Sequence, residues 1–320
     1  MAAISIIILF IIISIFISFA IGANDETFAT VHGSKTLMMR ELLILATILA
    51  IAGAFFLGRA VSETVGKDLL NISISNSIVL TILISTSIWL ILSSSLGAPI
   101  STTHSTIGSI MGIGILIGGF GGVNWLLIIE MSFWWLLSPV IGYIASYVVY
   151  KLIHKGIISR LNGFKDFERT EKIFSYILLG VICLTAFSRA GNDVSNAAGI
   201  VVGLGINVDL ILIISGLCFS AGIVVLGRRV IKSVGNITEL VPTSAFASEV
   251  PTAVILFVGT FLGIPLSGSH MLVASLIGLS KARRAPVKKG LWKIVIVWIL
   301  TFPMAALLAV LLFFPIDFFL

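Results

Sequence analysis

Two asparagine–aspartate pairs stand at matching places in the chain, each next to the end of an apolar run. They are Asn24-Asp25 and Asn192-Asp193, 168 residues apart. A carboxylate at membrane depth costs about 2.5 to 3.5 kcal/mol on insertion scales, so it is by default a candidate for function. Gly22 and Gly191 would let the backbone unwind there and free carbonyl oxygens for a hard cation. Alternatively both pairs are helix N-caps at the membrane surface, but the second copy favours a cation site.

Two hydroxyl-rich runs follow Gly-x-Pro sequences at Gly97 and Gly263. Glycine and proline end the preceding helix, and the first serine of each run is placed to cap the next helix. Hydroxyls, free backbone N–H groups and the positive end of a helix dipole then converge, which suits phosphate or sulfate. Alternatively the hydroxyls bond carbonyls of their own helix or hold helices together. The predicted oxyanion ligands are Ser101, Thr102, Thr103, Ser267, Gly268 and Ser269.

Four more polar residues fall within or beside apolar runs. His104 and His270 end the two hydroxyl runs, where a histidine could carry a proton or donate to an anion, or only bond across helices. Arg189 stands four residues before Asp193 and is expected to be its ion-pair partner near the membrane interface, with a substrate role as the alternative. Glu249 is expected to reach membrane depth.

The chain is a duplication. Four markers recur in the same order: the Asn-Asp pair, a Leu-Gly-Arg run at Leu57 and Leu226, the hydroxyl run, and a Trp-x4-Pro sequence at Trp134 and Trp298. Their offsets are 168, 169, 166 and 164 residues. Repeats with such constant offsets indicate duplicated structure. We predict a first membrane repeat over 1–150, a basic cytoplasmic linker over 151–172 and a second repeat over 173–320.

Composition identifies the class of protein. Of 320 residues, 58% are apolar and only 11% are charged, and the mean hydropathy is +1.18. Soluble domains carry about 25% charged residues, so this is an all-α polytopic membrane protein with room for about ten or more segments of about 20 residues. The net charge of +6 comes from Lys and Arg in short loops, so nucleic acid is excluded as a partner. The two cysteines, Cys183 and Cys218, suggest neither a disulfide framework nor a metal site.

Loop charges indicate that the two halves have opposite orientation. Each half contains five apolar blocks, at about 4–21, 42–57, 78–96, 101–117 and 125–150, and at about 173–187, 210–226, 246–262, 267–279 and 292–314. After the fourth block, 118–124 has no Lys or Arg, whereas 281–293 has six. Cationic loops stay in the cytoplasm. We therefore predict two inverted-topology repeats with broken helices or re-entrant hairpins, both termini outside, and a binding site near the midplane.

These motifs resemble the inorganic phosphate transporter (PiT) family, whose halves each carry a Gly-Ala-Asn-Asp-Val-Ala-Asn signature and a Gly-x-Pro-Val-Ser-Thr-Thr-His motif. The resemblance covers nearly the whole chain and implies transport of phosphate with Na⁺, H⁺ or a metal, without enzymatic activity. It adds Asn196 to the cation ligands. Phe28 replaces the second asparagine of the first signature, Glu26 is an extra acid, and Gly268 stands where the family usually has threonine. Ala50 and Ser220 align with a glutamate of sodium-coupled members.

We thus expect a secondary transporter that imports inorganic phosphate by Na⁺ symport through alternating access, with Na⁺ at Asp25 and Asp193 and no further cofactor. Cations would neutralise the carboxylates so that phosphate can bind, and this is the coupling. Open alternatives are a permease for sulfate or another oxyanion, an H⁺-coupled symporter that uses His104, His270 and Glu26, and an anion channel. The short linker favours a prokaryotic plasma membrane. Whether the protein forms a homodimer in the bilayer is left open by the sequence.

Overall fold

The computed structural model describes residues 2–95, 100–202, 206–286 and 291–319, and every regular element in these ranges is helical. Helices satisfy all backbone hydrogen bonds internally, which long apolar runs require in a bilayer. The first half contains α1 (Ala2–Ala23), α2 (Ala29–Gly33), α3 (Met39–Glu63) with its π-helical end η1 (Thr64–Asp68), α4 (Asn76–Ser95), α5 (Thr102–Gly118), the 3-10 turn η2 (Gly119–Gly122) and α6 (Trp125–Gly156). The second contains η3 (Ile158–Arg160), α7 (Phe164–Val202), α8 (Val208–Gly222), η4 (Ile223–Gly227), α9 (Arg228–Gly235), α10 (Pro242–Phe261), α11 (Gly268–Arg283) and α12 (Leu291–Phe319).

Eight helical segments of the described chain are long and apolar enough to cross a membrane. They are α3 with η1, α4, α5 with η2, α6 with η3, α7, α8 to α9, α10 and α12. Two other apolar segments are shorter: the part of α1 over Ile8–Ala23, and α11 with 16 residues. Large apolar side chains such as Leu126, Leu136 and Phe56 are exposed on the outside, as lipid contact requires. The chain is a multi-pass membrane protein.

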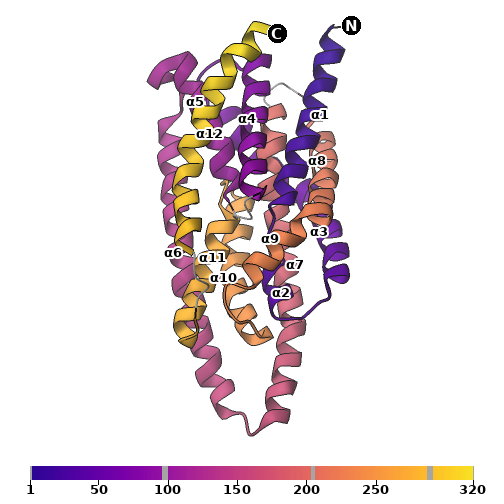
Figure 1. The fold of residues 1–320 in the computed structure, drawn as a ribbon, viewed down its shortest axis with the longest axis vertical. Coiled ribbons are helices and arrows are strands. Elements are labelled where there is room, and N and C mark those ends of the chain that lie inside the picture. Colours follow the sequence, from indigo (N-terminus) through magenta and orange to yellow (C-terminus); the bar gives the residue numbers. More distant parts are fainter. Residues whose placement is uncertain (1, 96–99, 203–205, 287–290, 320) are drawn as a thin grey trace.

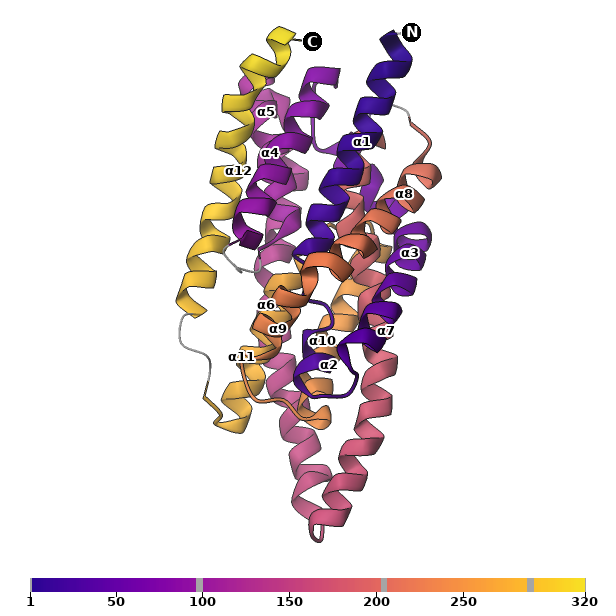
Figure 2. The ribbon, with the colours of Figure 1, turned by 45° about the vertical axis from the view of Figure 1, so that its right-hand side comes forward.

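The helices form one elongated bundle (Figure 1). Both described ends of the chain lie at its top, and the hairpin between α6 and α7 forms the bottom tip. Figure 2 shows the connection from α5 to α6 towards the end that carries the termini, whereas the end of α11 lies towards the hairpin. The residues predicted as a linker, 151–172, are mostly helical and belong to this hairpin.

Helices of one half pack mainly on helices of the other half. Helix α1 contacts α8, and α3 contacts α7; α6 contacts α10 and α11, and α12 contacts α4 and α5. Each contact therefore has a counterpart with the halves exchanged. Glycine permits the closest of these approaches: a Cβ at Gly53 would collide with the carbonyl of Phe187, and one at Gly222 with the carbonyl of Phe19. Small residues at helix crossings are typical of membrane bundles.

The predicted helix breaks are only partly correct. In the second half, Gly263 follows α10 with φ of +74°, which glycine adopts without steric cost; the matching Gly97-x-Pro99 lies outside the described residues. The expected unwinding beside Gly22 is present, because α1 ends at Ala23. The expected unwinding at Gly191 is wrong, because α7 continues through it to Val202. Its backbone carbonyls there stay within the helix.

Candidate ion and oxyanion site

Arg189, on α7, is the centre of a buried charged cluster. Its Nε lies 3.1 Å from Oδ1 of Asp25 and 3.0 Å from Oδ2 of Asp193, and its Nη2 lies 2.7 Å from Oε1 of Glu26. All four residues are at most 3% exposed. Three carboxylates therefore surround one guanidinium, an excess of two negative charges when all are ionised. Such an excess is costly in a low-dielectric interior unless cations balance it.

Hydroxyl groups from both halves complete this cluster. Thr102 Oγ1 donates to Oδ1 of Asp193 at 3.1 Å, and Thr27 Oγ1 donates to Oδ1 of Asp25 at 2.6 Å. Arg189 Nη2 donates to Ser269 Oγ at 3.1 Å. Two of the predicted oxyanion ligands, Thr102 and Ser269, thus lie in the same cluster as both predicted aspartates.

The asparagines of α7 leave two buried oxygens without a donor. Asn192 Nδ2 donates to Thr260 Oγ1 and to the carbonyl of Ile264, at 3.3 and 3.1 Å. Asn196 Nδ2 donates to Thr103 Oγ1 at 3.3 Å. Their Oδ1 atoms have no hydrogen-bond donor among the described residues. Oxygen atoms without donors are the ligands that a hard cation uses.

The N-termini of α5 and α11 meet in the middle of the molecule. Ser101 caps α5 by accepting from His104 N at 3.1 Å, and Ser267 caps α11 by accepting from His270 N at 3.4 Å. The predicted capping role of both serines is confirmed. The two ends also exchange bonds: Thr103 Oγ1 donates to the carbonyl of Leu266 at 2.9 Å, and Ser269 Oγ donates to the carbonyl of Ile100 at 3.2 Å.

Asn24 joins this centre from the end of α1. Its Nδ2 donates to the carbonyl of Ile100 at 3.1 Å, the same carbonyl that accepts from Ser269. Gly268 stands directly against Arg189, since a Cβ on it would lie 2.9 Å from Nε. The structure therefore assembles the predicted cation ligands Asn24, Asp25, Asn192, Asp193 and Asn196 and the predicted oxyanion ligands around two facing helix ends. Positive helix ends and unpaired oxygens side by side can hold an anion and a cation together.

The two predicted histidines face each other at one side of this region. The rings of His104 and His270 are 4.7 Å apart, and Trp135 lies 4.5 Å from the ring of His104. Nε2 of each histidine is buried without a hydrogen-bond partner in the described chain. Both border an apolar cavity of about 670 Å³ whose lining also includes Trp135 and Phe302. The pair is thus next to the capped helix ends, and it has no charged neighbour among the residues that line this cavity.

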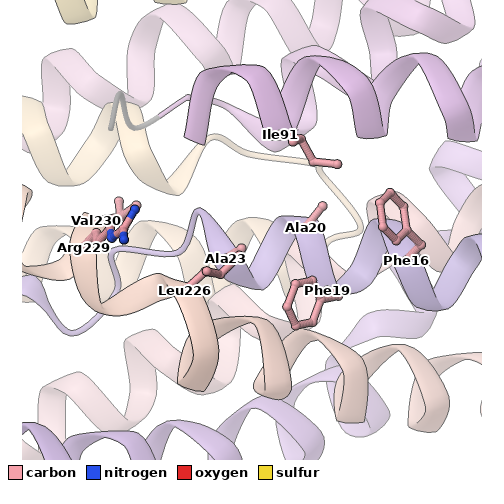
Figure 3. Close-up of a pocket in the computed structure, with 8 residues that line it drawn as sticks. All are labelled: Phe16, Phe19, Ala20, Ala23, Ile91, Leu226, Arg229 and Val230. Carbon is pink, nitrogen blue, oxygen red and sulfur yellow. The ribbon is translucent and has the colours of Figure 1, made fainter. Parts of the chain in front are cut away.

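A second cavity, of about 330 Å³, lies beside the end of α1. Figure 3 shows the residues that line it: Phe16, Phe19, Ala20, Ala23, Ile91, Leu226, Arg229 and Val230. Arg229 is the one charged residue among these. A buried oxyanion needs several hydrogen-bond donors, so this cavity does not suit phosphate.

Sequence reasoning underestimated two residues of the cluster. Arg189 does pair with Asp193 as expected, but it is 3% exposed and also pairs with Asp25 and Glu26. Its spacing of four residues from Asp193 was the available signal. Glu26 joins the same guanidinium, although nothing in its local sequence places it there. Glu249 is buried and accepts from Thr30 Oγ1 at 2.6 Å, which ties α10 to α2.

Comparison with known proteins gives this arrangement its context. The sequence profile of the Phosphate transporter family matches residues 21–309, a range that includes both Asn-Asp pairs and both hydroxyl runs. The chain belongs to the phosphate transporter family. Within it, a candidate phosphate permease of Thermococcus kodakarensis is 30% identical, over 95% of this chain and 96% of that protein. The chloroplastic inorganic phosphate transporter 2-1 of Arabidopsis thaliana is 26% identical, over 92% of this chain and 69% of its own.

A solved structure has the same fold. The sodium-dependent phosphate transporter superposes with a TM-score of 0.92 at 26% identity, covering 99% of this chain and 100% of its own. The resemblance to phosphate transporters found in the sequence is therefore confirmed, and the family is one of transporters and not of enzymes.

Proposed function

We propose that this phosphate transporter family member imports inorganic phosphate together with Na⁺ across the plasma membrane. The observation that carries the proposal is the convergence of Asp25 and Asp193, one from each half, beside the capped N-termini of α5 and α11. The similarity to a sodium-dependent phosphate transporter supports Na⁺ as the coupling ion.

In this mechanism phosphate binds at the helix ends, where Ser101, Thr102, Thr103, Ser267, Gly268 and Ser269 supply hydroxyl and backbone donors. Na⁺ binds the carboxylates of Asp25 and Asp193 and the amide oxygens of Asn24, Asn192 and Asn196. A divalent anion is repelled by the excess carboxylates until cations bind, so each ligand raises the affinity for the other. Each net positive charge that moves inward gains about 2.3 kcal/mol per 100 mV, which drives accumulation.

The primary test is uptake of radiolabelled phosphate into vesicles that contain the purified protein. An inward Na⁺ gradient at fixed pH should drive saturable accumulation, and an inward H⁺ gradient at fixed Na⁺ should not. Competition by excess sulfate should be weak. Uptake driven only by protons would identify H⁺ as the coupling ion and make His104 and His270 the candidate proton carriers. Preference for sulfate indicates another oxyanion permease, and flux that follows the phosphate gradient alone indicates a channel.

We further infer that 1–150 and 173–320 are inverted repeats joined by 151–172, with about ten segments and alternating access around the shared centre. The reciprocal packing of the helices and the opposite positions of the α5–α6 connection and the end of α11 (Figure 2) support this. Single Gly121→Cys and Arg284→Cys variants, in a protein with both native cysteines replaced by alanine, should react with membrane-impermeant reagents from opposite sides. Reaction from the same side would contradict the inverted arrangement.

A further inference from the structure

Arg189 occupies the space that a side chain at position 268 would need. Gly268 is the counterpart of Thr102, 166 residues earlier. A Cβ on Gly268 would lie 2.9 Å from Nε and 3.0 Å from Cζ of Arg189, closer than packed atoms approach. Thr102, in contrast, has a side chain, and its hydroxyl donates to Asp193. The first hydroxyl run therefore has a threonine at this position of the repeat, whereas the second has a glycine, and the guanidinium of Arg189 fills the space beside it.

One nitrogen of the Arg189 guanidinium has no hydrogen-bond acceptor among the described residues. Nε forms ion pairs with Asp25 and Asp193; Nη2 forms an ion pair with Glu26 and donates to Ser269. Nη1 is buried and has no hydrogen-bond partner among the residues that the structure describes. Buried polar groups are normally satisfied, so unused N–H groups on a residue 3% exposed indicate an acceptor that binds there. A guanidinium presents its donors in a planar fork that matches phosphate oxygens.

The partners that Arg189 now has are the groups that a transported cation would need. Asp25 and Asp193 cannot offer the same oxygens to Nε and to Na⁺ at full strength. A cation that binds these carboxylates therefore weakens their hold on the guanidinium. An arginine released in this way stays tethered to α7, beside Ser269 and the N-terminus of α11.

We propose that Arg189 is a displaceable internal cation and a phosphate ligand. Without Na⁺ it forms ion pairs with Asp25, Glu26 and Asp193; when Na⁺ binds Asp25 and Asp193, the guanidinium turns to the incoming phosphate. This inference rests on the proposed function, and it names Arg189 as the residue that couples Na⁺ binding to phosphate binding. It also accounts for Gly268, which makes room for the arginine, and for Glu26, the extra acid that Nη2 contacts. No bond is made or broken, because only ion pairs exchange.

The decisive measurement is equilibrium binding of ²²Na⁺ and of radiolabelled phosphate to purified wild-type protein and Arg189→Gln. Removing the competitor should strengthen Na⁺ binding in the absence of phosphate about fivefold or more. Losing a charged hydrogen-bond donor should weaken phosphate binding at saturating Na⁺ about tenfold or more. The factor by which Na⁺ raises phosphate affinity should fall towards one. Unchanged or weaker Na⁺ binding, or phosphate affinity within twofold of wild type, overturns the proposal.

Further variants separate this role from simple structural pairing. Arg189→Lys keeps the charge and loses the fork, so it should retain Na⁺ affinity near wild type yet bind phosphate more weakly; wild-type phosphate affinity in this variant contradicts the ligand role. If Arg189→Gln does not fold, Glu26→Gln combined with Arg189→Gln preserves the summed charge and should show the same two changes. Arg59→Gln is the control, because Arg59 forms an exposed ion pair with Asp209 and should change neither affinity.

A double-mutant cycle tests the contact itself. Gly268→Ala should displace the guanidinium and weaken phosphate binding in the wild-type background. In the Arg189→Gln background the same change should add little, because the guanidinium that it would displace is absent. Equal effects in both backgrounds would overturn the assignment of Gly268.

These outcomes are distinguishable from failure of the proposed function. Phosphate binding to wild-type protein that does not depend on Na⁺ contradicts Na⁺ symport, however the arginine variants behave. Na⁺-dependent binding that Arg189→Gln retains at wild-type strength contradicts the role of Arg189 alone.

Discussion

The two copies of the signature share the Asn-Asp pair and have different backbones. In the first, α1 ends at Ala23 and α2 begins at Ala29, so Asn24 and Asp25 lie in a turn. In the second, Asn192 and Asp193 lie within the uninterrupted helix α7. Both aspartates nevertheless reach the same guanidinium. The two equivalent carboxylates are therefore positioned differently: a turn holds Asp25, and a regular helix holds Asp193.

The residue two positions after each aspartate explains the difference. Asp25 Oδ1 accepts from the backbone N of Thr27 at 3.3 Å and from its hydroxyl at 2.6 Å. A side chain that takes a backbone N–H in this way competes with the helix. In the second copy Ser195 donates instead to the carbonyls of Gly191 and Gly58, which leaves the helical hydrogen bonds in place. The first copy is thus the adaptable side of the site, and the second is its fixed side.

The largest effect should come from removing charge on the fixed side. Asp193→Asn should lower Na⁺-driven phosphate uptake about 100-fold or more, because breaking a buried ion pair costs about 3 to 5 kcal/mol. Asp25→Asn should lower it less, about tenfold, because the turn can present Glu26 in its place. Initial uptake rates in vesicles at matched protein content measure both. Asp209→Asn, at an exposed ion pair, is the control, and equal losses at Asp25 and Asp193 would remove the distinction between the two sides.

A smaller effect should follow from removing the helix caps. Ser101→Ala and Ser267→Ala should each weaken phosphate affinity by about 1 to 2 kcal/mol, or roughly 5- to 30-fold, through loss of a desolvated hydroxyl. Because α5 and α11 are capped in the same way, the two losses should be similar although the neighbouring signatures differ. Phosphate binding at saturating Na⁺ checks this. Wild-type affinity in both variants, at normal protein level, contradicts the oxyanion assignment.

The smallest effect should come from loosening the turn. Thr27→Val keeps the shape and removes the hydroxyl that Asp25 accepts from, a net loss of about 0.5 to 1.5 kcal/mol. Apparent Na⁺ affinity for driving uptake should change about two- to tenfold, and maximal uptake should be retained. The matched change on the fixed side, Ser195→Ala, should affect thermal stability more than Na⁺ affinity. The reverse pattern would mean that α7, and not the turn, adjusts to the cation.

The sequence predicted much of this arrangement and missed its centre. Within the described residues, the ten apolar blocks coincide with helices to within one residue at their ends, and Ser101 and Ser267 cap α5 and α11, because hydropathy and capping chemistry act over short stretches. The continuity of α7 through Gly191 could not be read from the same cues, because glycine permits unwinding without requiring it. The approach of Asp25 and Glu26 to Arg189 depends on tertiary packing between residues more than 160 positions apart in sequence, which local spacing does not encode.

The reciprocal packing of the halves also affects how the protein is made. Helices α1, α3 and α5 contact α8, α7 and α12, respectively, all of which are synthesised later. At about 5 to 20 residues per second, the ribosome needs about 10 to 30 s to add the residues after 150. During that interval the first helices have inserted in the bilayer without their main partners, and Asp25 and Glu26 lack Arg189. Nascent chains of this protein therefore pass through a stage that is membrane-bound but unassembled, open to membrane proteases and dependent on prompt completion of translation.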